Sequence, residues 1–189
     1  MNVKTLISPT EPAQYLTRRV ALRRALFGLV CGSIGGSLLE YLPEGTEGSP
    51  INPNETIVTL PRDIQWNAWT GLPKHSGEMA ALYGDLNIPG PYLVFMKWNP
   101  GWMSAPHTYA TDRLSVVVSG TWWVNSGEDF DPDDCVPVPA GGFVRRVAHT
   151  PHYDGVKKHA KQPAIIAIFG MAPVDLKLVD PSKPAWRKL

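Results

Sequence analysis

Two stretches of sequence decide the fold of this chain: GWMSAPHTYATDRLSVVVSG (residues 101–120) and GGFVRRVAHTPHYDG (residues 141–155). In the first, five residues separate Gly101 from His107, and six separate Arg113 from Gly120. Both stretches set glycines among β-branched and aromatic residues, which is typical of strands joined by tight turns. Each also carries a histidine at a place where a strand or its flanking turn could present it to an interior.

Short apolar runs separated by turn residues continue on both sides of these stretches. Gly120 marks a tight turn or bulge within one of them. The 19 prolines and 17 glycines suit many short strands better than long helices. We therefore expect an all-β protein, a closed barrel or jelly roll, without a long helix after residue 45. The runs predict strands at residues 56–60, 79–84, 91–98, 114–125, 143–148, 163–169 and 174–179.

Length and charge exclude some classes of protein. The 189 residues allow one compact domain with extensions. The net charge is +1, from 18 basic and 17 acidic side chains, which argues against a nucleic-acid binder. Two cysteines occur, Cys31 and Cys135, and removal of an N-terminal segment would leave Cys135 without a disulfide partner.

The N-terminal residues 1–45 have the form of a targeting segment that runs into a linker. Arg18 and Arg19 resemble the twin-arginine export signal of bacteria, and the uncharged run at 25–39 follows them. That run is shorter than the roughly 20 residues needed for a stable membrane span. We expect export to the bacterial periplasm; alternatively this segment is an amphipathic helix of a cytoplasmic protein. The remaining divisions that we expect are a linker at 46–55, a barrel at 56–180 and a polar tail at 181–189.

The first stretch resembles the first motif of the cupin superfamily. That motif is a glycine, five residues, His-x-His, three or four residues, a glutamate, six residues and a glycine. Gly101, His107 and Gly120 stand in register with it. Tyr109 takes the position of the second histidine, and Arg113 takes that of the glutamate.

The second stretch resembles the second cupin motif in the same way. Gly141 and His152 fall at the positions of its glycine and its histidine. The proline, glycine and asparagine of the motif are replaced by Val147, His149 and Val156. The resemblance implies a double-stranded β-helix, which is a jelly-roll barrel, over roughly residues 56–180.

The resemblance also implies a metal site, although its ligand set is altered. Carried over by position, His107 and His152 remain as ligands. Tyr109 is a conditional third ligand, since a phenol coordinates only as the phenolate. The implied cofactor is a divalent transition metal, namely Zn, Fe, Mn or Ni.

Three interpretations of this site stay open. In the first, His107 and His152 hold a metal, Arg113 pairs with a small anionic substrate, and the remaining ligand is Tyr109, Asp112 or His149. In the second, the same pocket binds a small anion without a metal, as a binding or sensor barrel. In the third, the barrel is structural and dimeric. An enzyme of this kind would be a metal-dependent oxygenase, isomerase or lyase, with Tyr109 and Arg113 as its catalytic candidates. The expected partners are a small molecule and a second copy of the chain, without nucleic acid.

Several other side chains have simpler expected roles. We expect one of Arg145 and Arg146 to face inward and the other outward, because adjacent strand residues point to opposite faces. His75 and His159 are expected at the surface. Four aspartates are expected in a solvated hairpin loop, namely Asp129, Asp131, Asp133 and Asp134. Four tryptophans are expected mainly in the core, namely Trp98, Trp102, Trp122 and Trp123.

Overall fold

The computed structural model of this protein describes residues 54–69 and 71–189. Strands dominate these residues, which contain no α-helix and one short 3-10 turn, η2 (Pro61–Asp63). Within the same residues, no helix has the length and apolarity needed to cross a membrane. The expected leader at 1–45 and most of the expected linker at 46–55 lie outside the described residues.

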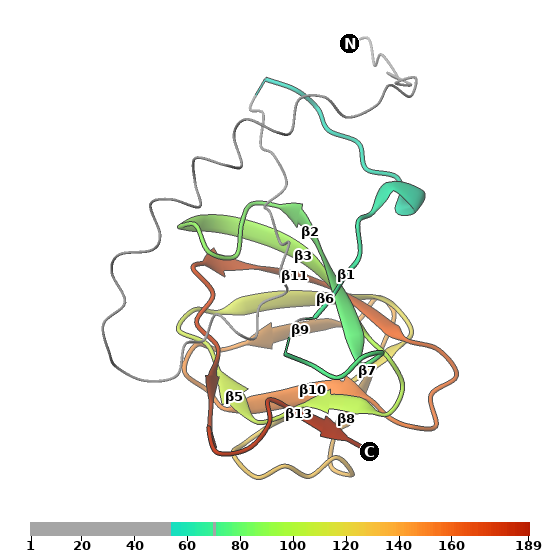
Figure 1. Cartoon of the computed structure of the whole chain (residues 1–189), viewed down its shortest axis with the longest axis vertical. Helices are drawn as coiled ribbons and strands as arrows, with labels where there is room; N and C mark the ends of the chain where they lie inside the picture. Colours follow the sequence, from blue (N-terminus) through green and yellow to red (C-terminus); the bar gives the residue numbers. More distant parts are fainter. Residues whose placement is uncertain (1–53, 70) are drawn as a thin grey trace. The chain divides into compact units, whose positions relative to one another are not determined.

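One wall of the barrel is a six-stranded antiparallel sheet (Figure 1). Buried and outward-facing residues alternate along β6 and β11, so that one face of the sheet lines the interior. The strand order is β1 (Asn67–Ala68), β2 (Gly77–Tyr83), β3 (Gly90–Trp98), β11 (Ala164–Ala172), β6 (Arg113–Ser119) and β9 (Phe143–Arg146).

The facing wall is a second antiparallel sheet centred on β10 (His152–Val156). All five residues of β10 are buried. One side of β10 pairs with β4 (Trp102–Ser104) and β5 (His107–Thr108), and the other side pairs with β7 (Thr121–Ser126). The outer members of the sheet are β8 (Val136–Pro139), β12 (Lys177–Leu178) and β13 (Trp186–Lys188).

A glycine allows β10 and β4 to approach closely. A Cβ atom at Gly155 would lie 2.3 Å from the carbonyl oxygen of Trp102 and 2.5 Å from the Cα of Met103. Any larger residue would therefore push the two strands apart. Gly120 joins β6 to β7 in a tight turn, as the sequence predicted. Its φ of +74° is a conformation that is strained for a residue with a side chain.

The main core fills the space between the two sheets. It is built from aliphatic, methionine and aromatic side chains, among them Tyr92, Val94, Trp98, Trp122 and Ile166. A smaller cluster of Met103, Cys135 and Tyr153 packs on the outward face of the second sheet, against Trp123 and Phe130. An all-β jelly-roll barrel, as expected from the sequence, is confirmed.

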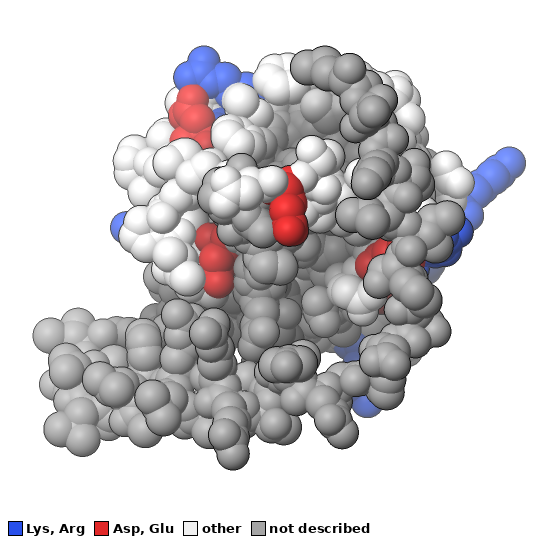
Figure 2. Space-filling view, turned by 90° about the horizontal axis from the view of Figure 1, so that it is seen from above, with Lys and Arg blue, Asp and Glu red and all other residues white. Residues whose placement is uncertain are grey.

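Charged side chains are spread thinly over the face drawn in Figure 2. Lysines and arginines lie singly or in small groups there, and the acidic residues lie apart from one another.

The aspartates of the β7–β8 connection are confirmed as a solvated loop, since Asp129, Asp131, Asp133 and Asp134 are all exposed. The Tyr153 hydroxyl holds this loop, because it accepts a hydrogen bond from the Asp131 amide and donates one to the Asp131 carbonyl.

One expected strand is absent and several observed strands were not expected. Residues 56–60 form no strand, and Ile57 and Val58 are 55% and 75% exposed. This run of β-branched residues has no partner strand among the described residues, and cross-strand pairing is what stabilises a strand. Strands β5, β8 and β10 were missed because they are short and contain proline, histidine or glycine, which weaken the strand signal. Strand β4 was missed because its three residues are too few to show a period.

The C-terminal residues are part of the barrel, whereas the sequence predicted a polar tail at 181–189. β13 pairs with β4, and the Trp186 ring lies 5.4 Å from the Trp102 ring, centroid to centroid. The Ala105 amide donates to the Ala185 carbonyl at 2.8 Å. The prediction was wrong because a strand of three residues, two of them basic, has too little periodicity to be recognised.

This pairing predicts that a change at the C-terminus will destabilise the whole barrel. Trp186→Ala should lower the free energy of unfolding by about 2 kcal/mol, less than for a fully buried tryptophan because Trp186 is only partly buried. Urea unfolding followed by tryptophan fluorescence and circular dichroism measures this difference. Lys183→Ala, which changes an exposed side chain of the same segment, should leave the unfolding midpoint unchanged. Equal midpoints for the two variants would contradict a structural role for β13.

Candidate metal centre

A cavity of about 100 Å³ lies between the two sheets. One part of its lining is polar and consists of His107, Tyr109, Arg113, Arg146, His152 and Asp154, with Ser104 and Ser115. The rest of the lining is apolar and combines aliphatic side chains with aromatic and sulfur-containing ones, including Trp69, Met79, Met96 and Trp98. The polar part gathers four of the sequence-predicted site residues into one place.

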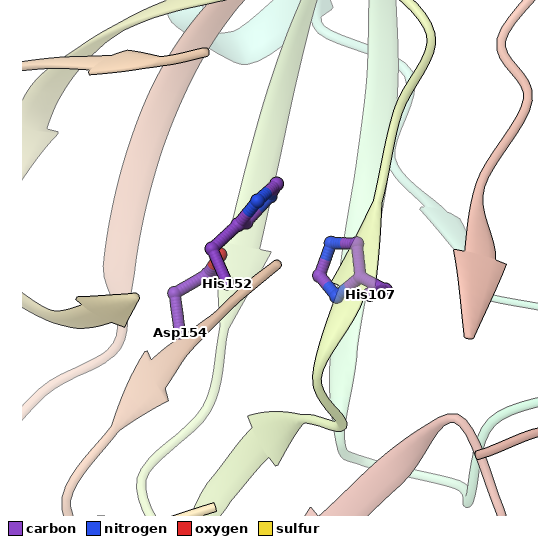
Figure 3. Close-up of side chains that lie close together, drawn as sticks. All are labelled: His107, His152 and Asp154. Atoms are coloured by element: carbon purple, nitrogen blue, oxygen red, sulfur yellow. The ribbon is translucent and has the colours of Figure 1, made fainter. Parts of the chain in front are cut away.

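The two histidines face each other across neighbouring strands (Figure 3). His107 on β5 is the register partner of His152 on β10, and their ring centroids are 4.5 Å apart. Directly opposed residues of antiparallel strands point to the same face, so both rings enter the barrel. The expected approach of these two histidines is confirmed.

Backbone carbonyls determine which nitrogen of each imidazole ring carries the proton. The Nδ1 of His107 lies 2.7 Å from the Ala105 carbonyl oxygen, and the Nδ1 of His152 lies 2.8 Å from the Thr150 carbonyl oxygen. Because a carbonyl can only accept, each Nδ1 carries the proton and donates it. The Nε2 of each ring is left with a free lone pair, which is the arrangement found for histidines that ligate metals.

Asp154 is the third donor of this group. It follows His152 by two positions on β10, and its side chain therefore enters the barrel on the same face. Its Oδ1 accepts a hydrogen bond from the Trp122 indole at 3.1 Å, and its amide donates to the Ser104 hydroxyl at 3.0 Å. The potential ligand atoms of His107, His152 and Asp154 all lie within 4.8 Å of one another.

This donor set fits a divalent transition metal. Two imidazole nitrogens and a carboxylate oxygen are ligands that suit first-row metals, with zinc and iron among them. The three residues are only 4%, 3% and 6% exposed, in the order His107, His152 and Asp154. The hydrogen bonds of both imidazoles and of the carboxylate would hold these ligands in orientation. His107, His152 and Asp154 could therefore hold a metal ion.

Burial keeps both histidines neutral. Loss of hydration lowers the pKa of His107 to about 4, against a smaller opposing effect of Asp154. Burial, followed by the nearby His107, lowers the pKa of His152 to about 2. A metal binds the neutral imidazole, so no proton has to leave either ring at pH 7.

Arg146 is tied to the acid of this group. Its guanidinium donates to the carbonyls of Asn125 at 2.9 Å and Tyr153 at 3.3 Å, and it lies 3.7 Å from the Asp154 carboxylate. Arg145 points outward and pairs with Asp112 at 2.6 Å. The expectation that one arginine faces inward and the other outward is confirmed.

Arg113 has no such acid. Its guanidinium carbon lies 4.1 Å from the centroid of the Tyr109 ring, so the cation rests on an aromatic face. It is 9% exposed, its Nε has no hydrogen-bond partner, and no ion pair joins it to a carboxylate within the described ranges. With both histidines neutral, the cavity lining carries the charges of Arg113 and Arg146 against that of Asp154, a net charge of +1 (2 − 1).

Tyr109 lies beside both histidines. Its ring centroid is 5.1 Å from that of His107 and 5.7 Å from that of His152. Burial raises the pKa of Tyr109 above its usual value, which favours the phenol over the phenolate. A phenol donates a hydrogen bond and ligates a metal poorly. The role of Tyr109 as a ligand stays a prediction, and the structure offers Asp154 as an alternative.

Two other candidates from the sequence lie elsewhere. Asp112 binds Arg145 and caps the amide of Ala148, and His149 is exposed with a φ of +60°. Neither belongs to the donor group of His107, His152 and Asp154. Asp154 was missed, although the alternation His152-Tyr153-Asp154 places it on the face of His152 by the argument that paired His107 with Tyr109. Trp98 and Trp122 belong to the core and also line the cavity.

Comparison with known proteins gives a fold match without a sequence match. No family model and no curated protein matches the chain. The solved polyketide cyclase RemF from Streptomyces resistomycificus is 13% identical, over 69% of this chain and 90% of its own, with a TM-score of 0.53. A cupin-2 domain protein from Rhodospirillum rubrum is 14% identical, over 71% and 86%, with a TM-score of 0.50. This chain has the cupin fold.

Other matches to the cupin barrel are weaker. A structure described as DMSP lyases RdDddP and RnDddQII is 15% identical, with a TM-score of 0.45. That match covers 55% of this chain and 53% of the other, so it spans about half of each. At these identities the likeness concerns the cupin fold alone, and the chemistry of this barrel has to be argued from its own residues.

The low histidine pKa values predict how the metal-free cupin barrel responds to acid. The unfolded chain protonates each histidine near pH 6.5, whereas in the folded barrel His107 stays neutral to about pH 4 and His152 to about pH 2. Below pH 6.5 the unfolded state therefore binds more protons, and the free energy of unfolding should fall as the pH falls, by about 1.4 kcal/mol per unit for each histidine.

Urea unfolding in the presence of a chelator, at steps from pH 7 to pH 5, measures this dependence above the titration range of ordinary carboxylates. The double variant His107→Gln, His152→Gln should show a flatter dependence, because glutamine does not titrate. His159→Gln, at an exposed histidine, should keep the wild-type slope. A wild-type slope in the double variant would show that these two histidines do not control the acid response.

Proposed function

We propose that this cupin is a small metalloprotein in which His107, His152 and Asp154 hold a divalent transition metal, namely Zn, Fe, Mn or Ni, next to a site for a small anionic molecule. One observation carries the proposal: three buried donors from neighbouring strands place their potential ligand atoms within 4.8 Å of one another. The neutral state of both imidazoles and their carbonyl partners support it.

The side chains around the donors have distinct roles in this proposal. When bound, the metal would supply Lewis-acid chemistry, which suits an oxygenase, isomerase or lyase. Arg113 binds the anionic group of the ligand, and the phenol of Tyr109 donates a hydrogen bond beside it. Trp122 and Arg146 orient the Asp154 carboxylate. Tyr109 and Arg113 thus remain the catalytic candidates, and the apolar walls exclude water from the group.

A metal-free binding barrel is a second candidate, and a specific observation favours it. The Asp154 carboxylate already has the Trp122 indole and the Arg146 guanidinium as partners, so it is stabilised without a metal. The lining would still carry a net charge of +1 and would attract an anion. Metal binding and anion binding therefore have to be measured separately.

The metal proposal predicts a stoichiometric site that depends on three residues. Purified protein, stripped with a chelator and titrated with Zn²⁺ or Co²⁺, should take up about one ion per chain. His107→Ala, His152→Ala and Asp154→Asn should each weaken binding at least tenfold, since removal even of a group that supports a ligand costs roughly 10- to 100-fold. Elemental analysis and isothermal titration calorimetry measure the uptake.

His159→Ala is the matched control, because His159 is exposed and lies outside the donor group. It should bind metal as the wild type does. Uptake of less than about a tenth of an ion per chain by the wild type would overturn the metal proposal in favour of the metal-free barrel. Full uptake by the His107→Ala, His152→Ala double variant would show that the ion sits elsewhere.

Export and dimerisation remain proposals that rest on the sequence. The signal around Arg18 and Arg19 lies outside the described residues. Replacement of both arginines by lysine should hold the protein in the cytoplasm of a bacterial host, because the twin-arginine pathway reads these side chains. Cell fractionation and immunoblotting measure the shift, and an unchanged compartment would refute this route. The homodimer and a small-molecule partner stay predictions.

A further inference from the structure

The cavity has two unlike ends, and strand register places them far apart. Arg113 is the first residue of β6 and lies two positions before Ser115. Ser115 is the register partner of Ile168 on β11, and Ile168 is that of Val94 on β3. Trp98 lies four residues further along β3 from Val94, in the opposite direction from Arg113. At about 3.3 Å per residue, the backbone levels of Arg113 and Trp98 differ by roughly 20 Å. A small ligand anchored at Arg113 therefore extends along the apolar lining toward Trp98 without spanning the whole distance.

The charged end has two arginines and a single carboxylate, that of Asp154. Arg113 and Arg146 are register partners on β6 and β9, yet only Arg146 has a carboxylate within ion-pair distance. The Arg113 guanidinium lies on the Tyr109 ring and interacts with the Tyr92 hydroxyl, and Asp154 acts on it only from beyond ion-pair distance. Its buried Nε has no hydrogen-bond partner in the described part of the chain. A buried charge without a counter-ion is costly, whereas a planar guanidinium can bind a carboxylate through two parallel hydrogen bonds. The Arg113 guanidinium could therefore bind one anionic group of a ligand.

The other end offers an apolar and aromatic surface. Met79 and Met96 are register partners on β2 and β3, and the rings of Trp69 and Trp98 meet edge to face at 4.5 Å. No charged side chain lines this end, and methionine sulfur packs well against aromatic rings. The indole N–H groups of Trp69 and Trp98 have no partner among the described residues, so they could satisfy one carbonyl or ether oxygen. They could not satisfy the many hydroxyl groups of a sugar.

We propose that the ligand of this site is a small monocarboxylate with an aromatic or branched apolar body. Its carboxylate binds Arg113, and its body extends from there along the apolar lining of Ile168 and Val94 toward the two methionines and Trp98. The cavity, at about 100 Å³, is of the same order as the roughly 150 Å³ cavity that takes up benzene in another protein, so the body is one ring or a few carbons. The inference deepens the proposed function and rests on its anion site, but it does not require the metal.

The test compares three kinds of probe on the full-length protein by isothermal titration calorimetry. Benzoate and 3-methylbutanoate carry one carboxylate on an apolar body, benzamide is the neutral analogue of benzoate, and glycerate carries the carboxylate on a hydroxylated body. Benzoate should bind more tightly than benzamide, which lacks the charge that Arg113 binds. 3-Methylbutanoate should bind more tightly than glycerate, whose hydroxyl groups do not suit the apolar lining. We expect a difference of roughly 10- to 100-fold in each comparison. These comparisons require no variant.

Two variants then locate the anion. Arg113→Gln should lose the preference for benzoate over benzamide, and Arg113→Lys should keep part of it because the charge remains without the two parallel hydrogen bonds. Arg145→Gln, which removes the neighbouring outward-facing arginine, should bind all probes as the wild type does. Circular dichroism and the melting temperature report whether each variant is folded.

The outcomes separate this inference from the metal proposal. Equal binding of benzoate and benzamide, or an unchanged preference in folded Arg113→Gln, would overturn the anion anchor. Equal or tighter binding of glycerate would overturn the apolar body. Repeating the titrations with chelator and with His107→Ala, His152→Ala distinguishes the two proposals. Carboxylate binding without metal uptake would refute only the metal, and metal uptake without the carboxylate preference would refute only the ligand class.

Discussion

The candidate site depends on the pairing of one buried strand, β10, with three neighbours. This strand supplies His152 and Asp154 to the interior, and its register with β5 brings His107 opposite His152. Gly155 lets β10 approach β4 closely, which keeps the Ser104 hydroxyl within 3.0 Å of the Asp154 amide. A slip of one residue in this pairing would turn both donors of β10 away from the barrel, so the register of the sheet determines whether the site exists.

Burial acts on the cationic groups of this cavity in opposite ways. It removes the charge from the histidines, because an imidazole can lose its proton at little cost near neutral pH. It cannot do the same to the arginines, whose guanidinium groups stay protonated. The interior therefore combines neutral ligands with a fixed positive charge, and only Arg146 has an acid of its own. At the position where the cupin motif has a glutamate, this chain has Arg113, which supplies a positive charge in place of a negative one.

The sequence predicted the barrel better than the site. Glycine spacing and the alternating apolar runs were sufficient for β2, β3, β6, β7, β9 and β11, because these strands are long enough to show a period of two. The β-branched run at residues 56–60 misled, because it has no partner strand among the described residues. His107 and His152 were found through motif positions. Asp154 was missed because the family pattern assigns no ligand there, although its spacing from His152 gave the necessary signal.

The end of the chain completes the surroundings of His107. The Ala105 carbonyl that orients the His107 ring belongs to a residue whose amide is bound by the Ala185 carbonyl, and β12 and β13 flank β5 and β4 from the same C-terminal segment. Ala105 and Ala185 are 80 positions apart in the sequence, so the support of the His107 ring comes from a long-range pairing. Such a pairing costs loop-closure entropy, and the finished donor group should therefore form late in folding.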